Sequence, residues 1–170
     1  ASVHLGPEGM LGGEAQNRVA GFWRALGKNP PPEPDHLAAL LGLYATLSEQ
    51  VRPEQKVSNE LSGFSEAEAV LITQGRDALL QEHIAPWVPA YLERVIEIAS
   101  GPYRGWAVLL DKVLQVELVR VGHPERLPLH LRESPPLADP QTDGADAFIS
   151  GLLAPVRAGI ILTRADLARL

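Results

Sequence analysis

The stretch of sequence that decides the fold is EPDHLAALLGLYATLSEQV, residues 33–51. After its first four residues, apolar side chains recur at intervals of three and four positions: Leu37, Leu40, Leu41, Tyr44, Leu47 and Val51. This spacing places them on one face of an α-helix. Pro34 suits the first turn of such a helix, where its missing backbone N–H costs nothing. We therefore predict a helix that begins near Pro34 and turns its apolar face into a core.

Patterns of the same period lie on both sides of this segment. They predict helices over 14–26, 65–83, 88–99 and 103–121, and a short helix near 146–153. Gly27 is a plausible C-terminal stop for the first, and Ser65 with Glu68 forms a capping-box pattern. The helix over 103–121 is expected to direct five side chains inward: Trp106, Leu109, Leu110, Val113 and Leu114. The segment before Gly13 and residues 52–64 read as loops, and 158–162 is the one candidate strand. The predicted fold class is all-α.

The length and composition fit one domain with its own core. The chain has 170 residues, of which 45% are hydrophobic and 21% charged, an ordinary globular balance. We expect a single helical bundle of about five main helices over 1–121, a Pro-rich loop over 122–145 and a C-terminal segment over 146–170. The absence of cysteine excludes disulfides, thiolate metal sites and a cysteine nucleophile.

Charge and hydropathy restrict the partners. Fifteen basic against 21 acidic residues give a net charge of −6, which argues against a generic nucleic-acid binder. No apolar run approaches the roughly 20 residues of a membrane span, and no signal peptide opens the given sequence. We expect a soluble cytoplasmic protein. The excess of acid lies mainly in the first half of the chain, which suits a basic ligand but also an ordinary solubilising surface.

The segment Glu33-Pro34-Asp35-His36 has two interpretations. In the structural one, Glu33 or Asp35 caps a helix and its charge complements the positive end of the helix dipole, at roughly 0.3–1 kcal/mol each. In the functional one, the proline-rich approach fixes two carboxylates and an imidazole as a binding site. The other chemistries find less support, because the sequence holds neither a nucleophile motif nor a phosphate loop, and His123 and His130 match no zinc spacing. We expect no metal and no cofactor.

Three stretches resemble the TorD-like redox-enzyme maturation chaperones, the TorD, DmsD and NarJ group. EPDHLAALLGLYATL at 33–47 resembles their signature, and the block from His83 to Tyr91, HIAPWVPAY, resembles their second motif. The opening SVHLGPEGMLGGEAQNRVAGFWRALG resembles the loop and helix before the signature, so the likeness covers about residues 1–120. A further likeness, to a C-terminal segment of longer members, lies at 154–167.

The resemblance implies an all-helical cytoplasmic chaperone without catalytic activity. Its partner would be the twin-arginine leader or the catalytic subunit of a molybdopterin oxidoreductase, held until the cofactor is inserted and export can follow. The client-binding role carries over to Glu33, Pro34, Asp35 and His36. It carries over less strongly to the residues of the second motif, which could instead shape a hinge and the core: His83, Pro86, Trp87 and Pro89.

This sequence also departs from the family pattern. Leu40 and Gly42 stand where many members carry further acids, and the helices that normally precede an SVHL-like segment are missing, so we expect a chain shortened at both ends. Such a loss would expose part of the Leu37, Leu41 and Tyr44 stripe, which predicts a homodimer, formed by exchange of helices between protomers. Two alternatives stay open: a helical metal-dependent hydrolase using Asp35, His36 and His83, and a structural subunit of an oxidoreductase complex.

Overall fold

The computed structural model describes residues 2–5, 11–51, 65–124 and 126–154, and every regular element among them is helical. In chain order these are α1 (Ser2–Leu5), α2 (Gly13–Ala25), α3 (Leu37–Gln50), α4 (Glu66–Leu79), the π-helix η2 (Leu80–Ile84), α5 (Val88–Ile98), α6 (Gly101–Val121), α7 (Leu129–Arg132) and α8 (Ala145–Leu152). No strand occurs in these ranges, so the all-α prediction is confirmed.

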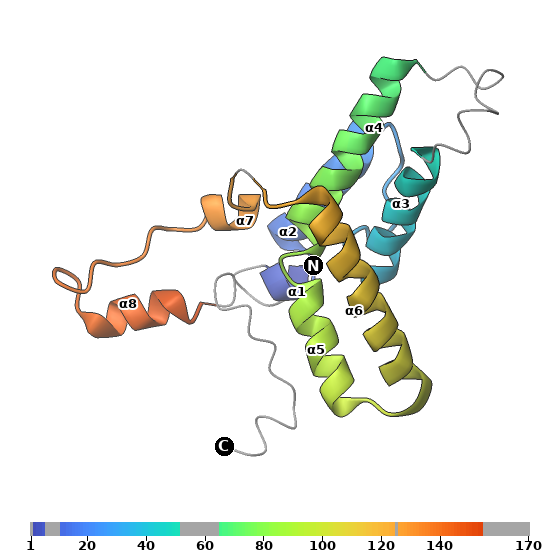
Figure 1. The fold of residues 1–170 in the computed structure, drawn as a ribbon. Helices are drawn as coiled ribbons and strands as arrows, with labels where there is room; N and C mark the ends of the chain where they lie inside the picture. The colour runs from blue at the N-terminus through green and yellow to red at the C-terminus, as the bar shows by residue number, and fades with distance from the viewer. Residues whose placement is uncertain (1, 6–10, 52–64, 125, 155–170) are drawn as a thin grey trace.

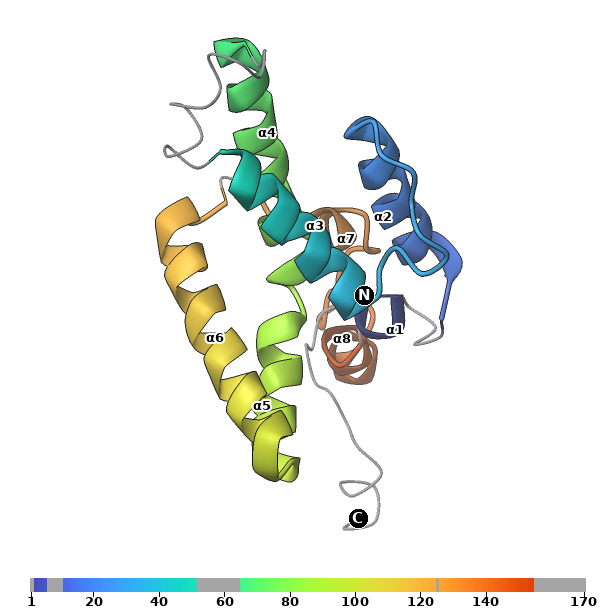
Figure 2. The same ribbon diagram turned by 90° about the vertical axis from the view of Figure 1, so that its right-hand side faces the viewer.

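The helices α3 to α6 form the body of the molecule (Figures 1 and 2). Helix α3 packs along α4, and α5 packs along α6 as an antiparallel hairpin, with η2 joining α4 to α5. Helix α1 packs on α2. Helices α7 and α8 lie on the side of the molecule opposite α6 (Figure 1). The start of α3, the start of α5 and α1 thereby approach one another, and this meeting point holds the site described below.

The core lies between α3 and the column formed by α4, η2 and α5. Its fully buried aliphatic side chains are Leu40, Leu43, Leu47, Leu79, Leu80, Ile84, Val88 and Leu92, each at most 2% exposed. Burying a side chain of this size contributes about 1.5–3 kcal/mol. The sequence predicted that Leu41 would lie in the core, but Leu43 is buried there and Leu41 is only half-buried. Helix α3 therefore turns a slightly different face inward from the one predicted. Leu37 and Tyr44 are half-buried and pack on the margin of this core.

Two predicted helix signals are confirmed in detail. Gly27 has a φ of 68° and its N–H donates to the Arg24 carbonyl, while the Lys28 N–H donates to that of Trp23, which closes α2 with a Schellman motif. Ser65 and Glu68 make both hydrogen bonds of the capping box that opens α4.

Three expectations about local structure are wrong. The segment before Gly13 was expected to be a loop, yet Ser2–Leu5 forms α1. Helix α3 begins at Leu37 rather than near Pro34, because His36 caps it and Pro34 lies in the preceding turn. The helix predicted over 65–83 ends as an α-helix at Leu79 and widens into η2, in which the Ala85 N–H donates to the Leu80 carbonyl at 2.8 Å.

Helix α6 turns a different face inward from the one expected. Trp106, Leu109 and Val113 are exposed, at 44%, 64% and 49%, whereas Ala107 and Leu114 are buried. Leu110 is half-buried and packs against the core. The reason is that α6 carries apolar residues on two faces, and the packing against α5 selects one of them.

The remaining predicted elements meet the structure only in part. The Pro-rich stretch contains the short helix α7, and α8 lies where a helix near 146–153 was expected. The expected loop at 52–64 and the candidate strand at 158–162 lie outside the described residues. No described helix is both long and apolar enough to span a membrane.

Candidate functional site

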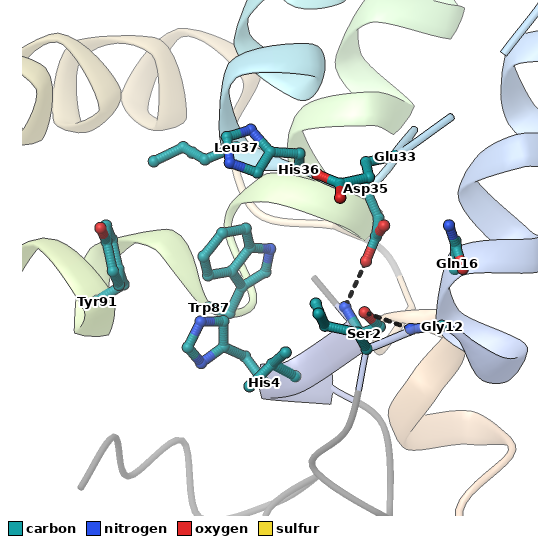
Figure 3. A pocket seen from close by; sticks show the side chains of 12 residues that line it. Ser2, His4, Gly12, Gln16, Glu33, Asp35, His36, Leu37, Trp87 and Tyr91 are labelled. Atoms are coloured by element: carbon teal, nitrogen blue, oxygen red, sulfur yellow. Dashed lines mark hydrogen bonds between the residues drawn. The ribbon is translucent and has the colours of Figure 1, made fainter. Parts of the chain in front are cut away.

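A cavity of about 360 Å³ opens where α1, the start of α3 and the start of α5 meet (Figure 3). It brings together four of the predicted site residues, Glu33, Asp35, His36 and Trp87. The other lining residues are Ser2, Val3, His4, Leu11, Gly12, Gln16, Leu37 and Tyr91. Acidic groups from the turn before α3 therefore share one cavity with aromatic groups from the beginning of α5.

Asp35 is the buried acid of this cavity, only 6% exposed. Its carboxylate accepts a hydrogen bond from the Ser2 backbone N–H at 2.7 Å (Figure 3). Burial acts to raise the pKa of Asp35, but hydrogen bonding to Ser2 lowers it, and the net direction is downward. A buried carboxylate that stays ionised is expensive unless it is paired. Asp35 is thus a fixed negative charge at neutral pH.

Glu33 and His36 are the exposed polar groups at the mouth of the cavity. The turn that carries them is fixed by the His36 N–H, which donates to the Glu33 carbonyl at 3.2 Å. His36 is itself the N-cap of α3, because its Nδ1 accepts from the Ala38 N–H at 3.2 Å. The structural interpretation assigned capping to an acid and thus chose the wrong side chain.

The proline-rich approach to this turn is held against α2. The Gln16 side-chain amide donates to the Pro32 carbonyl at 3.2 Å, and Pro34 is buried in the turn. The prolines restrict φ along this segment, so little conformational freedom remains to be lost there. The sequence thereby positions Glu33 and Asp35 before any ligand arrives.

An aromatic wall of Trp87, His4 and Tyr91 closes the opposite side of the cavity. Trp87 is 5% exposed, and its indole N–H donates to the His83 carbonyl at 2.9 Å. The His4 ring stacks on the indole, with centroids 4.6 Å apart and planes at 13° (Figure 3). The Tyr91 ring is tilted against both, at 5.9 Å from His4 and 5.8 Å from Trp87.

The combination of carboxylates and aromatic rings in this cavity favours the binding of a flat cation. Carboxylates attract positive charge and accept hydrogen bonds from it, and the faces of indole and phenol rings attract cations. A guanidinium group has both properties, because it is planar, permanently charged and rich in donors. The cavity offers the chemistry of a site for an arginine side chain.

The remaining predicted site residues do not line this cavity. His83 packs its ring edge-on against Phe22, with centroids 5.3 Å apart, and burial lowers the pKa of His83 to about 4. Pro89 lies in the first turn of α5. Pro86 lines a second, more apolar cavity of about 620 Å³, formed with Gln81 of η2 and Leu118 and Val119 of α6.

Sequence reasoning missed the other polar and aromatic side chains of the cavity: Ser2, His4, Gln16 and Tyr91. SVHL and Tyr91 stood in the stretches that resemble the chaperone family, but nothing in their spacing assigned them to a site. A hydrogen bond between Ser2 and Asp35 spans 33 positions, and such a contact leaves no local periodicity.

The geometry bears on the metal-site alternative as well. That hypothesis needed His83 beside Asp35 and His36, and His83 is not among the residues that line their cavity. Within the described ranges, no three His, Cys, Asp or Glu side chains gather so that they could hold a metal ion. The hydrolase hypothesis therefore lacks its third ligand in this part of the chain.

Comparison with known proteins identifies a family. No curated protein and no solved structure matches the chain. A family model described as nitrate reductase delta subunit matches residues 1–93, more than half of the 170 residues. The matched range contains every residue that lines the acidic and aromatic cavity. It confirms the resemblance read from the motifs at 33–47 and 83–91: the chain belongs to the nitrate reductase delta subunit family, a family of molybdoenzyme assembly chaperones.

Proposed function

We propose that this protein is a cytoplasmic chaperone, without catalytic activity of its own, for the assembly of a molybdopterin oxidoreductase. It binds the twin-arginine leader or the catalytic subunit of that enzyme before cofactor insertion and export. Membership of the family supports the assembly role, because its chaperones bind subunits of nitrate-reductase-type molybdoenzymes. The leader as ligand comes from the resemblance at 33–47 and 83–91, and the chemistry of the cavity supports it.

The observation that carries this proposal is the pairing of acid and aromatic groups in one cavity. Glu33 is exposed at its mouth, Asp35 is ionised inside it, and Trp87 and Tyr91 form a wall. One arginine of a leader enters the cavity and pairs with a carboxylate, while its neighbour stays near Glu33. Bonds between ionised partners contribute about 1.5–3 kcal/mol each where they are shielded from water, and less at the surface.

Calorimetric titration with two synthetic peptides tests the proposal. One peptide carries an Arg-Arg pair followed by an apolar stretch, and the other has Lys-Lys in its place. The wild-type protein should bind the Arg-Arg peptide more tightly, because only guanidinium pairs with carboxylate through two parallel hydrogen bonds. Added salt should weaken the binding, since exposed charges are screened beyond about 8 Å at physiological ionic strength.

Two matched variants locate the binding site. Glu33→Gln should weaken binding of the Arg-Arg peptide by about threefold to tenfold, as expected for a partly exposed ion pair. Glu93→Gln removes the same charge from an exposed position of α5 outside the cavity and should leave the affinity unchanged. Equal affinity of all three proteins for both peptides would place client binding elsewhere. Permanent copurification with an oxidoreductase would instead favour the structural-subunit alternative.

A further inference from the structure

Helix α1 occupies the part of the cavity that an arginine would need. Ser2 is 1% exposed, and its backbone N–H donates to the Asp35 carboxylate at 2.7 Å. The His4 ring covers a face of the Trp87 indole at a centroid distance of 4.6 Å. Figure 3 shows both contacts reaching from one short segment toward the acidic turn and the aromatic wall.

These two contacts resemble the contacts that a bound guanidinium group would make with Asp35 and Trp87. Ser2 supplies an N–H donor to the carboxylate, and His4 supplies a flat, nitrogen-bearing ring on the indole. An arginine side chain supplies both from a single planar group, and adds a positive charge. Burial lowers the pKa of His4, so its ring is neutral when it covers Trp87. The incoming cation gains an electrostatic attraction that His4 lacks.

Helix α1 depends on its contacts with the rest of the protein to stay in place. It has four residues, far fewer than a helix needs for stability of its own. Besides the two contacts above, Leu5 is 6% exposed in the core, and the Ser2 hydroxyl accepts from the Gly12 N–H at 3.3 Å. The His4 ring also contacts that of Tyr91 at 5.9 Å, and α1 packs on α2.

The receiving groups also have contacts that do not involve α1. Trp87 is held by its hydrogen bond to the His83 carbonyl, and the Asp35 turn is held by the backbone bond between His36 and Glu33. The indole and the acidic turn therefore have support outside α1, whereas α1 is too short to persist without its tertiary contacts.

We propose that residues 2–5 act as an internal competitor, and that a client arginine displaces Ser2 from Asp35 and His4 from Trp87. This inference rests on the proposed function and adds its regulation. In the free protein, α1 covers the Asp35 carboxylate and one face of the Trp87 ring. A client must therefore compete with α1 for both groups. Because the client binds only molecules in which α1 is undocked, its apparent affinity falls in proportion to the undocked fraction.

Two substitutions at position 2 separate the backbone donor from the side chain. Ser2→Pro removes the N–H that Asp35 accepts, and proline is tolerated at the first position of a helix. Ser2→Ala keeps that N–H and removes only the hydroxyl. In titrations with the Arg-Arg peptide, Ser2→Pro should bind about tenfold more tightly than wild type, as expected when a bond to an ionised acceptor is lost from the closed state. Ser2→Ala should bind like wild type, within about twofold.

Amide hydrogen exchange gives a second measurement on the wild-type protein. Addition of the Arg-Arg peptide should raise the exchange rates of residues 2–5, whereas the Lys-Lys peptide should raise them less. Tighter binding by Ser2→Pro together with faster exchange supports displacement. Unchanged or weaker binding by Ser2→Pro, or slower exchange in α1, would overturn the competitor while leaving the proposed function in place. Failure of wild type and both variants to bind the Arg-Arg peptide would overturn both proposals.

Discussion

At the scale of one residue, Asp35 shows how a hydrogen bond stabilises a buried charge. Asp35→Asn retains an oxygen that can accept the Ser2 N–H but removes the ionised acceptor. We expect the free energy of unfolding to fall by about 1 kcal/mol at pH 7, the difference between a charged and a neutral hydrogen bond. Asp35→Ala removes the acceptor altogether and should cost more, about 2 kcal/mol. Urea denaturation of the three proteins measures this order, and equal stabilities would contradict it.

His83 makes a pH-dependent prediction whose sign follows from burial. Its pKa is about 4 in the folded protein against an ordinary 6.5, so the fold favours the neutral ring. Stability is full above about pH 6.5 and falls as the pH drops toward 4, because the unfolded chain takes up the proton first. Between pH 6.5 and 5 the loss should approach 2 kcal/mol.

The control for this effect is a second histidine. His83→Gln should reduce the dependence of stability on pH between 6.5 and 5, because His83 carries the largest pKa shift of the histidines. His123→Gln, which alters an exposed ring in the Pro-rich stretch, should leave it as in the wild type. The comparison is made by urea denaturation at both pH values. A dependence that survives unchanged in His83→Gln would assign the acid sensitivity to another group.

Trp87 was expected to pack into the core, and its 5% exposure agrees. Trp87→Ala should lower the free energy of unfolding by about 3–5 kcal/mol, as truncation of buried aromatic residues does. Trp87→Phe keeps an aromatic ring but loses the donor to the His83 carbonyl, and should cost less, about 1–2 kcal/mol. Thermal or urea denaturation of the wild type and both variants measures these losses. A loss below about 1 kcal/mol for Trp87→Ala would show that the indole contributes little to the fold.

At the scale of elements, the sequence predicted which segments are helical better than which face each helix buries. Helix signals are local, and Gly27 and Ser65 stop and start helices through contacts with close neighbours in the chain. The buried face depends on a partner. Trp106, Leu109 and Val113 fit a helical stripe as well as Ala107 and Leu114 do, and only α5 distinguishes them.

A polar cluster couples three helices and gives an element-scale prediction. The Tyr44 hydroxyl of α3 donates to Glu117 of α6 at 2.6 Å, and Arg120 of α6 donates to Tyr44 and to Asp77 of α4. Burial and the bond to Glu117 raise the pKa of Tyr44 to about 12, so it remains a donor at neutral pH. Tyr44→Phe should lower the free energy of unfolding by about 1–2 kcal/mol, because Glu117 loses a partner.

The matched control is Tyr103→Phe, which removes the same hydroxyl from a side chain that is 74% exposed. That change should alter stability by less than about 0.5 kcal/mol. A double-mutant cycle of Tyr44→Phe with Arg120→Ala should give a coupling energy of about 1 kcal/mol. Additive effects would show that the cluster does not tie α3 to α6.

At the scale of the whole molecule, the cavity joins four separate stretches of the sequence, residues 2–4, 11–16, 33–37 and 87–91. Of the site residues predicted from the family resemblance, Glu33, Asp35, His36 and Trp87 line the cavity. That Ser2 and His4 complete it could not be predicted, because the contact is created by packing of α1 at the junction of α2, α3 and α5. His83 and Pro89 carried the same motif signal but lie outside the cavity.

The homodimer expected from the sequence stays a prediction, but the structure changes its basis. The Leu37, Leu41 and Tyr44 stripe is half-buried in the described fold, so it cannot supply the exposed patch on which that expectation relied. The large exposed apolar side chains of α6 are instead Tyr103, Trp106, Leu109, Val113, Val116 and Val119. Helix α6 also forms an outer edge of the molecule (Figures 1 and 2). Contiguous apolar surface of this kind favours association, and a two-fold pairing would use the same face twice.

Light scattering at tens of micromolar should therefore give about twice the monomer mass of 18.4 kDa. Leu109→Lys places a charge at a 64% exposed position in the middle of α6, where it should not disturb the fold, and should shift the protein to monomer. Leu153→Lys makes the same change at the end of α8, at a position of similar exposure, and should leave the dimer intact. A monomeric wild type would contradict the dimer itself. A dimer that persists in Leu109→Lys would mean that the pairing uses a face other than α6, since an unpaired lysine buried at an apolar interface costs more than a marginal dimer can offset.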